Sequence, residues 1–505
     1  MRIFAARLAL VCLVLAGPSV PLRAQETTPV KLLAAINRAS GAPYRYHVHS
    51  VIDRPPTKPH GTPLSSTIDA QGIAHETKDC RELAEIPELR VVTECSDYYF
   101  DGARLYEVDM NQTALHAGVQ ADAFEATLSA IESYAFTDPD FVRRGGRVTA
   151  VKDHLIVTAP GGIPMDVGID PQTMLVQSAV NVKTTGSTID AFNFTFADQR
   201  PLANDVVLPF EIDVRGQLYL RFAQRAIVKE PFEPPEGLIP HFAAGPTTIK
   251  MEGSRAGAPP VTTCTIGGVA ATCLLDTGNS GMSMSLELAE RLGLEPVSAP
   301  FEVHGIGSYE TGLVKAPALT VGTATYPAAR YVVLHDISRL GYDLVLGADF
   351  FARTRVTLDY PHRTIMLAAE STPKDDADAI PIRFINFVPV AAVQLAGVDA
   401  RLALDTGDDS AINLAESFSK AHPGLFKPTG STAVGGVGGE SEEITGNISS
   451  VRIGRMTLEH QPIGVTKGLA PTAQGHLGSG FLARFAVTFD YERERATLIA
   501  PTARP

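Results

Sequence analysis

The sequence has no cluster of basic residues that stands apart from the rest, and beyond residue 24 no apolar run reaches about 18 residues. Its 505 residues carry 43 Lys and Arg against 56 Asp and Glu, so the net charge is −13 at pH 7. Proteins that bind phosphate groups or an anionic membrane have clusters of positively charged residues. Because this sequence has no such cluster, we expect no nucleic-acid partner. We also expect no transmembrane segment in the mature chain.

Several common catalytic motifs are missing as well. The chain contains no Gly-x-Ser-x-Gly turn, no His-Glu-x-x-His helix and no glycine loop of the kind that cradles phosphate. His47 and His49 alternate on one expected strand face, but no third metal ligand accompanies them, which favours a polar strand face. His304 and His476 are interpreted as local hydrogen-bonding residues because no Ser or Cys nucleophile motif accompanies them. We therefore predict no metal site and no cofactor.

Cysteine is scarce, with five in the whole chain, one of them the N-terminal Cys12. The other four are Cys80, Cys95, Cys264 and Cys273. An even number permits two disulfides in an oxidising compartment, and we predict the pairs Cys80–Cys95 and Cys264–Cys273. A two-residue turn at residues 267–268 would pair Cys264 with Ala271, which places Cys273 diagonally opposite on the same sheet face. The alternative is that these are free thiols packed as small apolar groups.

The N-terminal segment has the layout of a cleaved secretory signal. Arg2 and Arg7 precede an apolar stretch at residues 8–16, and a small residue, Ala24, ends the segment. An uncleaved anchor is the alternative, but the apolar stretch is too short to span a bilayer. We therefore expect a signal peptide at residues 1–24 and a periplasmic or secreted mature protein.

The composition indicates a mostly β protein. Glycine (43) and proline (36) are both abundant, and short β-branched runs recur between turn residues. Two stretches rich in proline and charge, residues 229–240 and 369–381, divide the mature chain into three parts. These are a β-rich accessory domain at 25–235 and two further domains at 245–370 and 378–505. The first of the two stretches predicts few contacts between the accessory domain and the rest of the chain.

The second and third parts repeat one another. LLDTGNSGMS at 274–283 matches LALDTGDDSA at 402–411, and LVLGADFFARTRVTLDY at 344–360 matches GHLGSGFLARFAVTFDY at 475–491. The spacing from Asp276 to Gly347 is nearly the same as the spacing from Asp405 to Gly478. Because the order and spacing of these features agree, we interpret one half as a duplicate of the other.

Each half places an Asp-Thr-Gly triplet after an apolar strand. Two carboxylates within about 3 Å of each other cannot both ionise, so they share one proton and present an acid beside a base. A water molecule held between them can lose a proton to one carboxylate while the other protonates a carbonyl oxygen. The threonine hydroxyl can join the two loops, and glycine lets the backbone approach the carboxylates closely.

From about residue 250 to 505 the chain resembles the aspartic proteases of the pepsin and retropepsin type. The resemblance rests on the two triplets, on the later apolar-Gly strands that end at Gly347 and Gly478, and on glycine-rich hairpins at 304–312 and 433–443. It implies two retropepsin-like β-barrel lobes joined in one chain, with Asp276 and Asp405 as the catalytic pair and a peptide or protein substrate. It also implies that the hairpins act as flaps, and that four residues support the pair. The supporting residues are Thr277, Gly278, Thr406 and Gly407, and the flap candidates are Gly305, Gly307, Tyr309, Gly435 and Gly438.

The residues that follow the triplets depart from the family pattern of Ser, Thr or Ala. They are Asn279 in the first half, and Asp408 followed by Asp409 in the second. The extra acids could disturb the shared proton or could point into solvent. The alternative to an aspartic endopeptidase is therefore a peptide-binding protein with a protease-like fold that does not cut.

The first part of the chain resembles the curved half-barrel of bacterial periplasmic lipoprotein carriers. Strands, a tyrosine-rich hairpin and LPFEI at 208–212 carry this resemblance. It implies that a lipid or another apolar ligand could bind in the concave face, and it gives a third possible function, that of a lipid or lipoprotein carrier.

Overall fold

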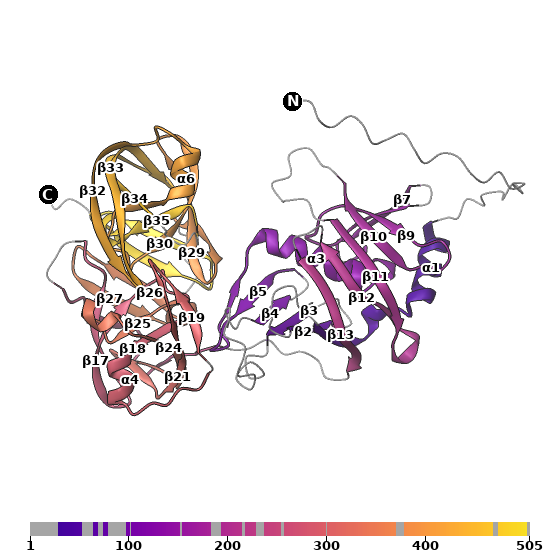
Figure 1. The fold of residues 1–505 in the computed structure, drawn as a ribbon, viewed down its shortest axis with the longest axis horizontal. Coiled ribbons are helices and arrows are strands. Elements are labelled where there is room, and N and C mark those ends of the chain that lie inside the picture. The colour runs from indigo at the N-terminus through magenta and orange to yellow at the C-terminus, as the bar shows by residue number, and fades with distance from the viewer. Residues whose placement is uncertain are drawn as a thin grey trace, which may run out of the picture.

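The computed structural model is mostly β, as the composition predicts, and Figure 1 shows its sheets in two groups. It describes residues 29–52, 64–68, 74–78, 97–100, 103–151, 154–182, 193–214, 218–228, 237–253, 257–298, 300–369, 378–467 and 473–501. The expected signal peptide and the expected Cys80–Cys95 pair lie outside these residues. Among them, no helix is long and apolar enough to cross a membrane.

The N-terminal part forms one antiparallel sheet in the order β6-β5-β4-β3-β2-β1-β13-β12-β11-β10-β9-β8-β7. Its strands are β1 (His47–Ile52), β2 (Leu64–Ile68), β3 (Ala74–Lys78), β4 (Asp97–Phe100), β5 (Leu105–Val108), β6 (Ala114–His116), β7 (Arg147–Val151), β8 (His154–Thr158), β9 (Met165–Ile169), β10 (Val176–Asn181), β11 (Asn193–Pro201), β12 (Val207–Val214) and β13 (Leu218–Val228). Its helices are α1 (Pro29–Ser40), η1 (Pro43–Arg45), α3 (Val119–Glu132), η2 (Ala135–Thr137) and η3 (Ala203–Asp205).

Helix α3 packs against this sheet and shares its core (Figure 1). Ala123, Ala126 and Ile131 on α3 are buried together with Phe194 and Ile212 on the strands. The alanines allow the helix to lie close to the sheet. The helix therefore covers part of one face of this sheet.

The second part of the chain forms a nine-stranded sheet in the order β14-β23-β22-β16-β17-β25-β18-β24-β21, with a separate hairpin β19-β20. Its strands are β14 (His241–Phe242), β16 (Val261–Ile266), β17 (Val269–Leu275), β18 (Met282–Ser285), β19 (Phe301–His304), β20 (Ser308–Thr311), β21 (Leu313–Ala316), β22 (Leu319–Val321), β23 (Ala324–Tyr326), β24 (Ala329–Leu334) and β25 (Leu344–Leu346). Its helices are α4 (Leu286–Arg291), η4 (Ile337–Leu340) and α5 (Ala348–Ala352).

Cys264 pairs with Ala271 across the β16-β17 hairpin, which confirms the register read from the sequence. Cys264 and Cys273 form a disulfide with a Cα–Cα distance of 6.0 Å.

The third part repeats the central strand order of the second. The run β29-β30-β35-β31-β34-β33 corresponds to β16-β17-β25-β18-β24-β21. Its strands are β28 (Ile380–Ile385), β29 (Val388–Leu395), β30 (Val398–Asp405), β31 (Ile412–Ala415), β32 (Lys427–Gly436), β33 (Gly439–Ile453), β34 (Met456–Thr466), β35 (Gly475–Gly478), β36 (Ala486–Asp490) and β37 (Arg495–Ile499). Its helices are α6 (Glu416–Ala421) and α7 (Ser479–Leu482). We refer to residues 257–369 as lobe 1 and to residues 378–501 as lobe 2.

Strands from both lobes share one run of the sheet, in the order β15-β27-β26-β36-β37-β28, where β15 is Thr247–Lys250, β26 is Arg355–Asp359 and β27 is Thr364–Ala368. At its centre Val356 of β26 pairs with Phe489 of β36, and both side chains are buried. This pairing fixes how the two lobes face each other.

The N-terminal part contacts both lobes, so the expectation of few contacts is wrong. In the turn between β5 and β6, Asn111 Nδ2 donates to Asp349 Oδ2 at 2.8 Å and to the Arg330 carbonyl at 2.9 Å. The hydroxyl of Thr113 also donates to Asp349. His116 lies 3.0 Å from Glu494 of lobe 2. A proline-rich linker does not limit contacts made by a distant turn of the same domain.

Candidate active site

The two aspartates lie at the ends of equivalent strands. Asp276 follows β17, and its N–H donates to the Leu346 carbonyl at 3.0 Å. Asp405 is the last residue of β30 and pairs in parallel with Gly478 of β35. In both lobes an apolar strand ends at the aspartate, beside an apolar-Gly strand. Asp405 is only 9% exposed.

The two threonines of the triplets join the lobes through reciprocal hydrogen bonds. The Thr277 N–H donates to the Thr406 hydroxyl oxygen, and the Thr406 N–H donates to the Thr277 hydroxyl oxygen, both at 3.0 Å. The Thr277 hydroxyl donates to the Leu404 carbonyl at 2.5 Å, and the Thr406 hydroxyl donates to the Leu275 carbonyl at 2.7 Å. Both threonines are fully buried, so these bonds satisfy groups that water cannot reach.

The glycine of each triplet leaves room for the carboxyl group of the opposite lobe. A Cβ added at Gly278 would lie 2.4 Å from Asp405 Cγ, and a Cβ added at Gly407 would lie 2.3 Å from Asp276 Cγ. Each carboxyl group thus occupies the space that a side chain on the opposing loop would need. This crossed arrangement brings Asp276 and Asp405 into hydrogen-bond contact.

The two carboxyl groups differ in proton affinity. Burial, followed by the negative charge of Asp405, holds the pKa of Asp276 well above its usual range. Burial alone would also raise the pKa of Asp405, but hydrogen bonding and the positive charge of His476 outweigh it, so the pKa of Asp405 falls below its ordinary value. The proton affinity of Asp276 is therefore higher than that of Asp405, so a single proton shared by the two groups favours Asp276.

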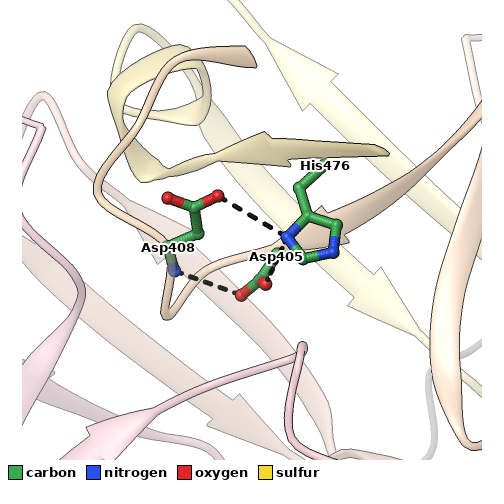
Figure 2. A group of neighbouring side chains, drawn as sticks. All are labelled: Asp405, Asp408 and His476. Atoms are coloured by element: carbon green, nitrogen blue, oxygen red, sulfur yellow. Dashed lines mark hydrogen bonds and ion pairs between the residues drawn. The ribbon is translucent and has the colours of Figure 1, made fainter. Parts of the chain in front are cut away.

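His476 lies between the carboxylates of Asp405 and Asp408 (Figure 2). Its Nδ1 is 3.1 Å from Asp405 Oδ2 and 3.6 Å from Asp408 Oδ2. The other oxygen of Asp405 accepts the N–H groups of Gly407 and Asp408 at 3.0 and 3.1 Å. Asp408 therefore turns toward the histidine, whereas Asp409 is exposed.

Asp405, Asp408 and His476 also offer three ligand atoms within 4.8 Å of one another, which is close enough to surround a metal ion. An ion-paired imidazolium accounts for the cluster without a metal, because its positive charge lies within 3.1 Å of Asp405 and 3.6 Å of Asp408 and offsets one of the two negative charges. A metal ion would have to displace that proton.

The two glycine-rich hairpins meet at their tips. The Gly307 N–H donates to the Val437 carbonyl at 3.1 Å. A Cβ added at Gly305 would lie 2.5 Å from the Val437 carbonyl oxygen, and one at Gly307 would lie 2.0 Å from the Gly438 carbonyl oxygen. Gly435, the fifth flap candidate, lies in the β32-β33 ladder beside this contact.

Asp336 connects both hairpins, a role that no sequence motif indicates. Tyr309 Oη donates to Asp336 Oδ1 at 3.0 Å, and the Gly438 N–H donates to Asp336 Oδ2 at 2.9 Å. One carboxylate thus holds the first hairpin by its tyrosine and the second by its tip. Asp336 comes from the segment before η4, outside both hairpins, so its position in the sequence does not mark it.

The other sequence candidates lie away from the pair or outside the described side chains. The His304 side chain is 65% exposed and lies 4.0 Å from Glu302. His47 and His49 both lie on β1, and the structure describes their backbone but not their side chains.

Residues 262–353 match the family model described as "gag-polyprotein putative aspartyl protease". The match covers most of lobe 1, including Asp276 and the hairpin at 304–312. No curated protein matches the chain. The chain therefore contains an aspartyl protease-like domain.

Proposed function

We propose that this chain is an aspartic endopeptidase that hydrolyses peptide bonds with water activated between Asp276 and Asp405. The crossed packing of each carboxyl group against the opposite triplet glycine carries this proposal. It holds two carboxyl groups of unequal proton affinity in contact with each other. The match of lobe 1 to an aspartyl protease model supports the same chemistry.

In the proposed reaction Asp405 is the base and Asp276 is the acid. Asp405 takes a proton from water while the water oxygen bonds to the peptide carbonyl carbon and Asp276 gives its proton to the carbonyl oxygen. The neutral diol then collapses: Asp405 returns its proton to the amide nitrogen, the C–N bond breaks, and one diol hydroxyl returns a proton to Asp276. The pair ends in its starting state, and no covalent enzyme intermediate forms.

The flaps and the threonine bonds support this chemistry in different ways. The threonines keep the triplet loops at a fixed separation, so the carboxyl groups need no reorganisation during the reaction. The flap contact through Asp336 would close the site over a bound peptide and exclude bulk water.

We further propose that the mature protein works outside the cytoplasm. The leader-like layout of residues 1–24 and the disulfide between Cys264 and Cys273 support this location. The N-terminal part would position the lobes, through the contacts of Asn111, Thr113 and His116 described above.

The test is to incubate the purified mature protein with a mixed peptide library from pH 3 to pH 8 and to sequence the products. We expect cleavage by the parent, and about a 10²- to 10⁴-fold loss in each of Asp276→Asn and Asp405→Asn. The double variant should lose little more than either single one, because the two groups act as a unit.

Circular dichroism and thermal unfolding would show that these variants remain folded. A parent that bound peptides without cutting them at any pH would support the non-catalytic peptide-binding protein instead. An Asp276→Asn variant with near-parental cleavage would refute the shared-proton mechanism.

A further inference from the structure

The internal repeat makes it possible to compare the two sides of the aspartate pair position by position. The residue after the triplet is Asn279 in lobe 1 and Asp408 in lobe 2. The residue two before the glycine of the apolar-Gly strand is Val345 in lobe 1 and His476 in lobe 2. The two equivalent positions are therefore occupied by neutral side chains in lobe 1 and by ionisable side chains in lobe 2.

Neither of these two positions carries a charge in lobe 1. Asn279 Nδ2 donates to the Gly281 carbonyl at 2.8 Å and to Ser283 Oγ at 3.1 Å. Val345 packs in a small apolar cluster with its strand neighbour Leu274. Asp276 therefore has no charged partner from these positions.

In lobe 2 a third difference accompanies the other two. The strand neighbour of His476 is Ala403, where lobe 1 has the larger Leu274. The smaller side chain accompanies the larger imidazole ring on the next strand. Burial alone would lower the pKa of His476, but its bonds to Asp405 and Asp408 outweigh it and raise that pKa to about 10.

Further acidic groups lie near Asp405 and Asp408, the two partners of this histidine. Glu443, on β33, is buried, and burial, followed by the charges of Asp408 and Asp409, raises its pKa. Asp276 lies beyond Asp405. An imidazolium at position 476 therefore lies among several carboxyl groups.

We propose that His476, held by Asp408, is a positioning residue that keeps Asp405 ionised and so assigns the shared proton to Asp276. The inference rests on the proposed endopeptidase function, whose acid and base it identifies. Without this ion pair the two triplets would be nearly equivalent, and the proton would have no fixed side.

Replacing His476 and replacing Asp408 should move the pH profile in opposite directions, because the two side chains carry opposite charges. An imidazolium stabilises both ionisation steps of the aspartates, so its removal moves both limbs of the pH profile of kcat/KM to higher pH. Asp408 opposes both steps, so its removal moves both limbs to lower pH. Replacing both residues removes one charge of each sign and should return the profile toward that of the parent.

The experiment gives lobe 2 the residues of lobe 1. We would measure pH profiles for His476→Val, Asp408→Asn and the double variant, with His362→Val as a control at an exposed histidine paired with Asp359. On the acid limb of the parent profile, kcat/KM of His476→Val should be about tenfold lower. A neighbouring charge changes the pKa of a carboxyl group by about 1 or more, and a change of 1 corresponds to a tenfold change on that limb. The control should match the parent.

A merely structural role would lower kcat/KM at all pH values without moving the limbs, and that result would overturn the inference while leaving the proposed function in place. The inference would also be overturned if the pH profiles of His476→Val and Asp408→Asn moved in the same direction. Loss of cleavage by the parent on addition of EDTA would also overturn it, because the three side chains would then hold a metal ion.

A second measurement does not depend on cleavage. NMR titration of the ¹⁵N-labelled imidazoles should show His476 protonated through pH 8 in the parent and titrating at lower pH in Asp408→Asn. A neutral His476 at pH 7 would refute the inference even if the protein proved not to be a protease.

Discussion

The sharpest test of the crossed carboxylates is to add one methyl group to each triplet. In Gly278→Ala the new Cβ would lie 2.4 Å from Asp405 Cγ, and in Gly407→Ala it would lie 2.3 Å from Asp276 Cγ. Carbon atoms in contact prefer about 3.5 to 4.0 Å, so the carboxyl group or the loop must move by about 1 Å. The loops are held by buried threonine bonds, so we expect the carboxyl group to be displaced.

A displacement of about 1 Å in a reacting group can cost about 10²-fold in rate, which corresponds to about 2.7 kcal/mol in the activation free energy. We therefore expect kcat/KM to fall at least about 100-fold in both variants, and about equally because the geometry is nearly symmetric. The free energy of unfolding should fall by only about 1 to 3 kcal/mol, the usual cost of overpacking.

The assay is cleavage of a peptide found in the library screen, with urea unfolding followed by circular dichroism. Gly430→Ala in β32 is the matched control, because its Cβ would meet no atom nearer than Thr445 Oγ1 at 3.7 Å. Near-parental activity in Gly278→Ala would refute the crossed arrangement. A comparable loss in Gly430→Ala would show that the effect is not specific to the triplets.

Two further predictions concern contacts outside the aspartate pair. Asp336→Ala removes the acceptor of two hydrogen bonds from the hairpins, each of which contributes about 1 kcal/mol. We therefore expect faster amide hydrogen exchange at Gly438 and an increase in KM of about tenfold. An unchanged exchange rate at Gly438 would contradict the connection of the hairpins through Asp336. Asn111→Ala should lower the free energy of unfolding by about 2 to 4 kcal/mol, because it breaks buried bonds to Asp349 and Arg330, whereas Thr113→Ser keeps its hydroxyl and should not. Equal stability of Asn111→Ala and the parent in urea unfolding would show that this turn does not hold the N-terminal part to the lobes.

Much of the central geometry could be read from the sequence because it depends on local pattern repeated twice. An apolar strand followed by Asp-Thr-Gly, with an apolar-Gly strand at nearly the same later position in each half, defines the same turn in both lobes. Where the pattern is duplicated, the structure duplicates the strand order too. The register of Cys264 and Ala271 followed from the two-residue turn between them.

The contacts that the sequence did not reveal join segments with no shared pattern. Asn111 and Asp349 are 238 residues apart, and the repeated segment that contains Asp349 gives no sign of a partner in the N-terminal part. Asp336 likewise serves two hairpins from outside both. A signal for His476 did exist: the aligned halves differ at this position and at the residue after the triplet, and two coupled differences suggest a contact. The sequence alone favours a local hydrogen-bonding role for this histidine, because no Ser or Cys nucleophile motif accompanies it.

The differences between the lobes also bear on why the two halves are joined in one chain. Two identical subunits that each supply one Asp-Thr-Gly triplet must place the same residues beside both aspartates. A histidine introduced at the position of Val345 would then appear on both sides, and its charge would favour neither carboxylate. In a fused chain His476 and Asp408 can occur in lobe 2 while Val345 and Asn279 remain in lobe 1. Two unlike halves in one chain would therefore permit the proposed fixed base and fixed acid, which a symmetric pair of identical subunits cannot encode.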